Sequence, residues 1–292
     1  MRELHRHTLF EPTRIIRRKT MHAAAENQLQ ESSPYALDGN SVGRALHLLY
    51  HELTARVAAN SYQLQTDIFR SHLHQLFRSG IARIRPCITF DDGHRSNYEQ
   101  AAPALEDFGV KAMFFITVGW TSSAPGDYMT WENLRSLQAA GHTIAAHGWS
   151  HKLFTHCDSA QLHREIVDAK AVLEDHLGTK ITALSFPGGR TNQRATEAAL
   201  GAGYTTLFTS QPQIEKLPLS TFVGRVNVRS DWDAKYMGSL FADDGHALHK
   251  LQRLDVIKKA AKGLLGDRLY SKVWSAVNRK EVEPESFRGS SK

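Results

Sequence analysis

Short apolar runs alternate with amphipathic helical patterns from about residue 45 to residue 230, and this alternation constrains the fold more than any other feature. The apolar runs that we expect to be strands cover residues 45–53, 84–90, 112–118, 143–146, 183–186, 204–208 and 222–228. Helical spacing of apolar residues predicts helices over 66–78, 97–108, 130–140, 159–177 and 193–201. Such an alternation predicts a parallel α/β sheet or barrel, in which active-site residues directly follow the strands.

The length of 292 residues allows one sizeable core with additional segments. No run of about 18 apolar residues occurs, so we do not expect a membrane-spanning helix. No apolar stretch follows the basic residues after Met1, which predicts a cytoplasmic protein unless the sequence is part of a longer precursor. Cys87 and Cys157 could form at most one bridge, and we expect two thiols in a reducing compartment.

The net charge of +6 is concentrated at the two ends of the chain. Residues 1–20 carry a charge of +4 and residues 246–280 carry +7, which leaves about −4 for residues 21–245. A protein that works on nucleic acid should carry its basic residues on the working surface. We therefore expect no nucleic-acid partner.

Three segments follow from these patterns. Residues 1–40 lack clear periodicity and predict a partly ordered leader, whereas residues 41–235 predict the catalytic domain. Residues 246–280 combine apolar residues at helical spacing with lysines on the opposite faces, which predicts a basic amphipathic helical extension. This extension could be a helical pair packed on the domain, or a helix at an anionic membrane surface near lipid-linked sugars.

Two adjacent carboxylates, Asp91 and Asp92, follow the expected strand 84–90 and precede Gly93. Neighbouring carboxylates are electrostatically unfavourable unless a cation or a proton relieves them. Along an extended strand they would point to opposite sides, but a turn assisted by glycine can direct both into one site. The alternative is an ordinary solvated turn.

His147 and His151 strengthen the interpretation that Asp91 and Asp92 lie in a site that binds a cation. Two histidines four residues apart lie on one helical face or in one turn, and can bind a single ion. Because no Glu follows the first histidine, the pattern is not that of an H-E-x-x-H protease. One carboxylate with two histidines is a common metal triad that leaves positions for water and substrate, so the second carboxylate remains available as a base.

The sequence Thr89-Phe-Asp-Asp-Gly93 together with His147-x-x-x-His151 resembles the first two motifs of the polysaccharide deacetylase family, the NodB-homology domain of carbohydrate esterase family 4. The resemblance extends over about residues 45–230. It implies an irregular (β/α)7-type barrel with the leader and the helical extension attached. It also implies that Asp92, His147 and His151 bind a divalent metal, usually zinc, and that Asp91 is the catalytic base.

Most members of this family place a histidine that acts as general acid in a late motif. The late candidates here are His246 and His249, and neither lies in an expected strand. The early Leu49-Tyr50-His51 resembles the arrangement in circularly permuted members, in which the first strand supplies this histidine. We therefore prefer His51 as the acid, with a packed strand histidine as the alternative.

Two further motifs of the family are altered here. Ser185-Phe-Pro-Gly-Gly-Arg190 resembles the third motif but lacks the arginine that often opens it and orients the base. By resemblance, Pro187 and the N–H of Gly188 would border the oxyanion, and Arg190 could reach the site or lie in a surface loop. The sequence Asp231-Trp232 resembles the fourth motif, whose Trp walls the acetyl site.

The leading hypothesis is a hydrolase that removes N-acetyl groups from a saccharide, such as a surface-glycan or exopolysaccharide precursor. One alternative is cleavage of another non-peptide amide on the same scaffold, because Gly188 replaces the aromatic residue usual after the proline. The other alternative is an inactive scaffold that binds sugar or a partner. The retention of both the two aspartates and the two histidines argues against this last reading.

Overall fold

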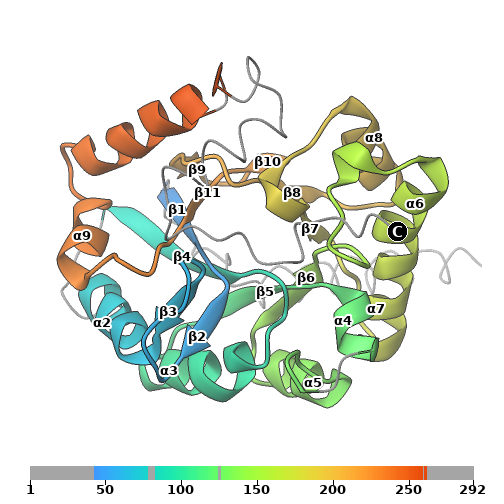
Figure 1. The fold of residues 1–292 in the computed structure, drawn as a ribbon, viewed down its shortest axis with the longest axis horizontal. Helices are drawn as coiled ribbons and strands as arrows, with labels where there is room; N and C mark the ends of the chain where they lie inside the picture. The colour runs from blue at the N-terminus through green and yellow to red at the C-terminus, as the bar shows by residue number, and fades with distance from the viewer. Residues whose placement is uncertain (1–42, 78–82, 124–125, 259, 262–292) are drawn as a thin grey trace, which may run out of the picture. The chain divides into compact units, whose positions relative to one another are not determined.

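The computed structural model describes residues 43–77, 83–123, 126–258 and 260–261 (Figure 1). These residues belong to one compact unit, Val42–Lys292, and the leader predicted over 1–40 lies outside the described residues. The part of the predicted extension at 259 and 262–280 also lies outside them. The fold below is that of the compact unit alone.

A nine-stranded sheet forms the centre of this unit, as far as the structure describes it. Its spatial order is β10-β8-β7-β6-β5-β4-β1-β11, with β9 paired antiparallel to β1 and the other pairs parallel. The strands are β1 (Arg44–Tyr50), β4 (Ile84–Phe90), β5 (Ala112–Ile116), β6 (Thr143–Ala146), β7 (Ala183–Ser185), β8 (Thr206–Phe208), β9 (Glu215–Lys216), β10 (Phe222–Val223) and β11 (Arg225–Asn227). A separate parallel pair comprises β2 (Glu52–Thr54) and β3 (Gln63–Gln65).

The two ends of the strand order are joined through Gly224. β10 pairs with β8 at one end and β11 pairs with β1 at the other, and only this glycine separates them in the chain. A Cβ atom on Gly224 would lie 2.3 Å from the carbonyl oxygen of Gln211, so the bend requires glycine. The sheet is thereby nearly closed into a barrel, which confirms the expected fold class.

Helices lie outside the strands in Figure 1, as expected for a βα barrel. They are α2 (Thr66–Phe77), α3 (Ala102–Asp107), α4 (Val118–Ser123), α5 (Trp131–Ala139), α6 (Ser159–His163), α7 (Ala169–Leu177), α8 (Gln193–Gly201) and α9 (Ala234–Ser239). The predicted helix start at Thr130 is confirmed, because its side chain accepts a hydrogen bond from the backbone N–H of Asn133 in a capping box. Fully buried Leu, Ile and Phe side chains of the strands and helices form the core.

Three predicted strands differ from the observed ones in where they end or divide. The run 45–53 divides into β1 and β2, with His51 between them. The run 112–118 stops at Ile116, and Val118 begins α4, in which Gly119 lies close to the backbone of Trp149. The run 222–228 divides at Gly224, as described above. The first two differences lie where the chain leaves the barrel, and the third lies where the sheet is closed.

The described part of the predicted C-terminal extension is helical over residues 246–258. Leu248 is buried in the core, whereas Leu254, Val256 and Ile257 are exposed. Within the described ranges, every helix is too short or too polar to traverse a bilayer.

Candidate active site

Asp91 and Asp92 are separated by a change of backbone direction at the end of β4. Asp91 continues the strand and its N–H donates to the carbonyl of Tyr50 at 3.0 Å, whereas Asp92 and Gly93 have φ values of 75° and 82°. A positive φ is unfavourable for a non-glycine residue and is common at functional sites. Because of this turn, Asp92 does not point to the side opposite Asp91, as it would in a continued strand, and both carboxylates approach His147. The sequence predicted such a turn, assisted by Gly93.

The segment from His147 to His151 is a loop after β6, so the two histidines lie in a turn rather than on a helix. Gly148 has a φ of 85° and His151 a φ of 61°, which folds the loop back on itself. The ring centroids of the two imidazoles are 5.0 Å apart, and both side chains are buried. The turn therefore presents both rings to the same carboxylate.

Glu165 holds this loop in place. Its Oε2 atom accepts hydrogen bonds from the backbone N–H groups of Trp149 at 2.8 Å and Ser150 at 3.0 Å, and its Oε1 accepts from the Ser150 hydroxyl. The carboxylate is buried, and it lies in a π-helical turn, Arg164–Asp168, between α6 and α7. Gly148 is required because a Cβ there would lie 2.7 Å from Glu165 Oε2. Such π-turns often occur at functional sites.

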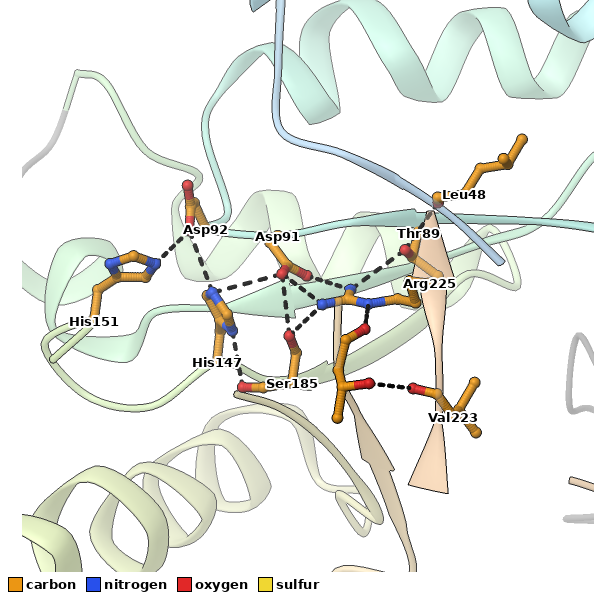
Figure 2. A network of polar contacts seen from close by, with 10 residues as sticks. Leu48, Thr89, Asp91, Asp92, His147, His151, Ser185, Val223 and Arg225 are labelled. Atoms are coloured by element: carbon orange, nitrogen blue, oxygen red, sulfur yellow. Dashed lines mark hydrogen bonds and ion pairs between the residues drawn. The ribbon is translucent and has the colours of Figure 1, made fainter. Parts of the chain in front are cut away.

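Asp92, His147 and His151 form a three-ligand set that fits one divalent metal ion. Asp92 Oδ1 lies 3.4 Å from His147 Nε2 and 3.2 Å from His151 Nε2, and the three ligand atoms lie within 4.8 Å of one another. For ligand bonds of about 2.1 Å, tetrahedral geometry places neighbouring ligand atoms about 3.4 Å apart. Figure 2 shows the two imidazoles on either side of the Asp92 carboxylate. The donor types and spacings therefore suit a metal.

The tautomer of His147 supports the same reading. Its Nδ1 lies 2.9 Å from the carbonyl oxygen of Ser185. A carbonyl oxygen can only accept, so Nδ1 carries a hydrogen and donates it. In the neutral ring, Nε2 then carries a lone pair directed at Asp92, and a metal ion between the two acceptors would satisfy both. Without a metal, the charges of Asp91 and Asp92 outweigh burial and raise the pKa of His147, which favours a proton on Nε2. Hydrogen bonding of the distal nitrogen to a carbonyl is the usual way to orient a metal-binding histidine.

Arg225 on β11 binds Asp91 in the interior of the barrel, a contact that the sequence analysis did not predict. Its NH1 and NH2 groups donate to Asp91 Oδ1 at 2.6 Å and Oδ2 at 2.8 Å, as Figure 2 shows. The NH2 group also donates to the Ser185 hydroxyl, which in turn donates to Asp91 Oδ2. The rings of Phe115 and Phe208 lie 4.9 and 5.7 Å from the guanidinium carbon.

These contacts determine how the two carboxylates titrate. Burial acts to raise the pKa of Asp91, but the charges of Arg225 and His147 outweigh it and hold the pKa below its ordinary value. Burial also opposes ionisation of Asp92, yet the two histidines hold its pKa well below the usual range. Both groups are therefore ionised at neutral pH. Asp91 accepts hydrogen bonds from Arg225 and Ser185 on one side, and its Oδ2 lies 3.6 Å from His147 Nε2 on the other.

His51, the predicted acid, lies directly after β1 and beside this cluster. Burial lowers its pKa, while the charges of Asp92 and Asp91 act in the opposite direction. Its carbonyl accepts a hydrogen bond from the Asn97 side chain at 2.6 Å, and its ring packs edge-on against Tyr62. The alternative candidates, His246 and His249, are exposed on the helix over 246–258.

The third-motif residues follow β7, whose last residue, Ser185, contacts both Asp91 and His147. Pro187 is buried, and Gly188 is exposed with a φ of 64°. Gly189 is required by a close approach, since a Cβ there would lie 2.4 Å from Ser210 Oγ. Arg190 is half-buried. The predicted oxyanion role of Pro187 and Gly188 stays a prediction, as does a substrate contact of Arg190.

Trp232, predicted to wall the acetyl site, is a buried member of the hydrophobic core. Its ring packs against Tyr236 at 4.7 Å, and its carbonyl oxygen lies 2.8 Å from His72 Nε2. These contacts join α2 to the segment before α9. The contact of Trp232 with an acetyl group stays a prediction.

Comparison with protein-family models finds the family described as polysaccharide deacetylase over residues 85–207. The YxkH protein of Bacillus subtilis (strain 168), which is named for the same family, is 27% identical over 183 residues, covering 56% of this chain and 64% of its own. A chitin deacetylase from Pestalotiopsis sp is 31% identical over 117 residues, covering 40% of this chain and 38% of its own. The alignments thus span less than two thirds of either relative.

Solved structures show the same fold. The Streptococcus pyogenes deacetylase PplD, solved in complex with acetate, superposes with a TM-score of 0.61. The superposition covers 67% of this chain and 96% of PplD, at 19% sequence identity.

Proposed function

This chain belongs to the polysaccharide deacetylase family through residues 85–207, and from that premise we propose that it removes N-acetyl groups from a saccharide with the help of a divalent metal. The family comprises hydrolases that act on carbon–nitrogen bonds other than peptide bonds. The observation that carries the proposal is the combination of a three-ligand set with a neighbouring carboxylate outside it. Asp92, His147 and His151 supply the ligands, and Asp91 remains available as the base.

Asp91 accepts the proton of the attacking water in this proposal. Its lowered pKa keeps it ionised, and the bidentate contact with Arg225 fixes both oxygens before the reaction begins. When bound, a divalent metal supplies Lewis acidity, which polarises the acetyl carbonyl and lowers the pKa of water. The backbone N–H of Gly188 would donate to the oxyanion, and Pro187 would border it.

His51 donates a proton to the departing nitrogen. The acetyl carbon–nitrogen bond then breaks, and the products are acetate and a free amine on the sugar. The lowered pKa of His51 means that this histidine is neutral in the free protein at neutral pH and must gain its proton during the reaction cycle. The electrostatic interaction of His51 with Asp91, the proposed base, supports His51 in this role over the exposed His246 and His249.

We further propose zinc as the metal, because two imidazoles and one carboxylate are ligands that zinc commonly accepts. The substrate would be a surface-glycan or exopolysaccharide precursor handled in the cytoplasm. The second candidate function is hydrolysis of another non-peptide amide, which the exposed Gly188 keeps open. An inactive scaffold is the third, and the presence of the three-ligand set together with Asp91 argues against it.

One experiment separates these functions. The metal-loaded protein and Asp91→Asn are incubated with a panel of N-acetylated oligosaccharides and simple acetamides, and acetate release is followed by mass spectrometry. We expect the loss of 42 mass units, one acetyl group replaced by hydrogen, from saccharides with the parent protein alone. Release from acetamides but not sugars favours the second candidate, and release from nothing favours the third.

The C-terminal extension is proposed to contact anionic membranes. The exposed Leu254, Val256 and Ile257, together with basic residues of the same segment, support this contact. Flotation with vesicles containing anionic lipid, with and without residues 246–292, tests it. Absent binding, or binding that truncation leaves unchanged, rejects it.

A further inference from the structure

We propose that Asp91 and His51 are held in register by Asn97, a positioning residue that fixes the direction in which His51, the proposed general acid, presents its imidazole ring. The proposal rests on the deacetylase function above. It assigns a role to a buried amide that is neither a metal ligand nor the base. The contact that carries it is the hydrogen bond from Asn97 Nδ2 to the carbonyl oxygen of His51, at 2.6 Å.

The chain leaves the central sheet at His51. The carbonyl of the preceding residue, Tyr50, still belongs to the sheet and accepts from the N–H of Asp91 at 3.0 Å. His51 lies between the end of β1 and the start of β2, and its carbonyl accepts from the Asn97 side chain instead. A backbone carbonyl that leaves a sheet needs another donor. Asn97 supplies that donor at the residue where the chain passes from β1 to β2.

The direction of the His51 ring depends on the main chain that carries it. The Nδ1 atom of His51 is buried and, within the part of the chain that the structure describes, has no hydrogen-bond partner. His147 differs, because its Nδ1 donates to a carbonyl and its ring is oriented directly. The ring of His51 has packing contacts such as the edge-on contact with Tyr62. A fixed carbonyl therefore limits how the Cα–Cβ bond of His51, and with it the ring, can point.

The segment around Asn97 links the proposed acid to the base. Asn97 follows Asp91 closely in the chain and opens the π-helical turn Asn97–Ala101. The hydroxyl of the neighbouring Ser96 accepts from the N–H of Leu53 at 2.9 Å. Two consecutive residues therefore attach the segment of the acid to the segment that follows the base. Proton transfer depends on such fixed geometry, because a displacement of about 1 Å can lower the rate about 100-fold.

Packing alone does not explain an amide at position 97. The Asn97 side chain is fully buried, and its Oδ1 atom accepts no hydrogen bond from the described residues. The contact identifies the two amide atoms, because the carbonyl oxygen of His51 can only accept and must face Nδ2. A buried oxygen without a donor is unfavourable. An apolar side chain of similar size would avoid this penalty, so the donor function of Nδ2 accounts for the amide.

The test replaces Asn97 by Leu, which is close to Asn in size and removes the donor. With the metal-loaded full chain, kcat and KM are measured on the N-acetylated oligosaccharide that the parent protein deacetylates fastest. The same proteins are assayed on 4-nitrophenyl acetate, an ester whose leaving group departs without a proton. Urea unfolding identifies the variants that are folded under the assay conditions. Asn97→Ala takes the place of Asn97→Leu if the larger side chain prevents folding.

We expect kcat for the oligosaccharide to fall about 10- to 100-fold, with KM, metal content and ester hydrolysis close to the parent level. In a His51→Ala background the substitution of Asn97 should cause no further loss, because a residue that acts through His51 then has nothing to position. A merely structural role would lower turnover in both backgrounds. Tyr204→Phe is the matched control, since it removes another buried donor to a backbone carbonyl, that of Ile166 at 3.1 Å, and should retain the parent kcat.

A parent-like kcat in the Asn97 variant would overturn the inference and leave the deacetylase proposal standing. The same holds for an equal loss on the amide and the ester, and for a further loss in the His51→Ala background. An equal loss of kcat in Ser96→Ala, which frees Leu53 but not His51, would also overturn the assignment to Asn97. Failure of the parent protein to release acetate from any N-acetylated oligosaccharide would reject the deacetylase, and the role of Asn97 with it.

Discussion

Arg225 donates hydrogen bonds from both terminal nitrogens to the two carboxylate oxygens of Asp91, at 2.6 and 2.8 Å, although 134 positions separate the two residues. Both side chains are almost completely buried, the arginine on β11 and the aspartate at the end of β4. Charge-assisted bidentate pairs of this kind are strong and fix geometry. The pair also links the strand that completes the barrel to the proposed base.

Replacing Arg225 by Gln should change the pH dependence of the reaction. Asp91 has to be ionised to accept a proton, so activity rises as the pH rises through its pKa. Arg225 holds that pKa down against burial, so its loss raises the pKa of Asp91 and moves the acidic limb of kcat/KM to higher pH. We also expect kcat/KM at neutral pH to fall about 10- to 100-fold. Arg135→Gln, at an exposed position, is the control, and an unmoved acidic limb would contradict the assignment.

The same pair should show strong coupling in unfolding experiments. Asp91→Asn leaves the charge of Arg225 buried without its partner. Arg225→Met likewise leaves the charge of the Asp91 carboxylate buried without its partner. Each single change should lower the free energy of unfolding by about 3–5 kcal/mol. The double variant should cost clearly less than the two single changes together. Urea unfolding of the metal-free protein measures all four forms, and additive effects would show that the charges do not depend on each other.

Asp91 makes this stabilisation depend on pH. Its pKa is lowered in the folded state, so the contribution is complete above the unfolded pKa of about 3.9 and is lost as the pH falls through the folded value. In Asp91→Asn, the free energy of unfolding should no longer contain the part that the parent protein loses when Asp91 is protonated at low pH.

The sequence predicts most of the barrel because several strands contain apolar runs that tertiary packing buries on both faces, as in β5 and the second half of β4. The short polar strand β9 (Glu215–Lys216) carries no such signal. The sequence predicts Asp91, Asp92, His147 and His151 because these residues lie in two compact motifs. The role of His51 as the general acid stays a prediction.

Arg225, in contrast, belongs to no local motif. One signal was available, since a charged residue inside the apolar run 222–228 is rarely buried without a partner. The identity of that partner depends on the register of β1 between β4 and β11, which the local pattern does not encode. Glu165 was missed for the same reason, since it meets the backbone of Trp149 and Ser150 only in the folded chain.

Replacing Glu165 by Gln should weaken metal binding. Gln can place its carbonyl oxygen where Glu165 Oε2 accepts both backbone N–H groups, but it replaces the charged carboxylate by a neutral amide, so these hydrogen bonds and the anchoring of the loop between His147 and His151 become weaker. Changes to groups that orient metal ligands typically cost 10- to 100-fold in affinity. Competition with a chelator measures the metal dissociation constant. Glu197→Gln on α8 is the control, and unchanged metal affinity in Glu165→Gln would show that the anchor serves folding alone.

Replacing His51 by Ala should separate proton donation from metal binding. Metal content should remain at the parent level, whereas turnover of N-acetylated saccharide should fall about 10²- to 10⁴-fold, the range for loss of a general acid. An acetyl ester needs less help than an amide because its leaving group departs more readily, so the variant should lose less activity on an ester. His246→Ala and His249→Ala are the controls and should retain normal turnover. If His51→Ala loses amide and ester activity equally, the histidine positions the substrate or the base; if it retains near-normal amide turnover, another group supplies the proton.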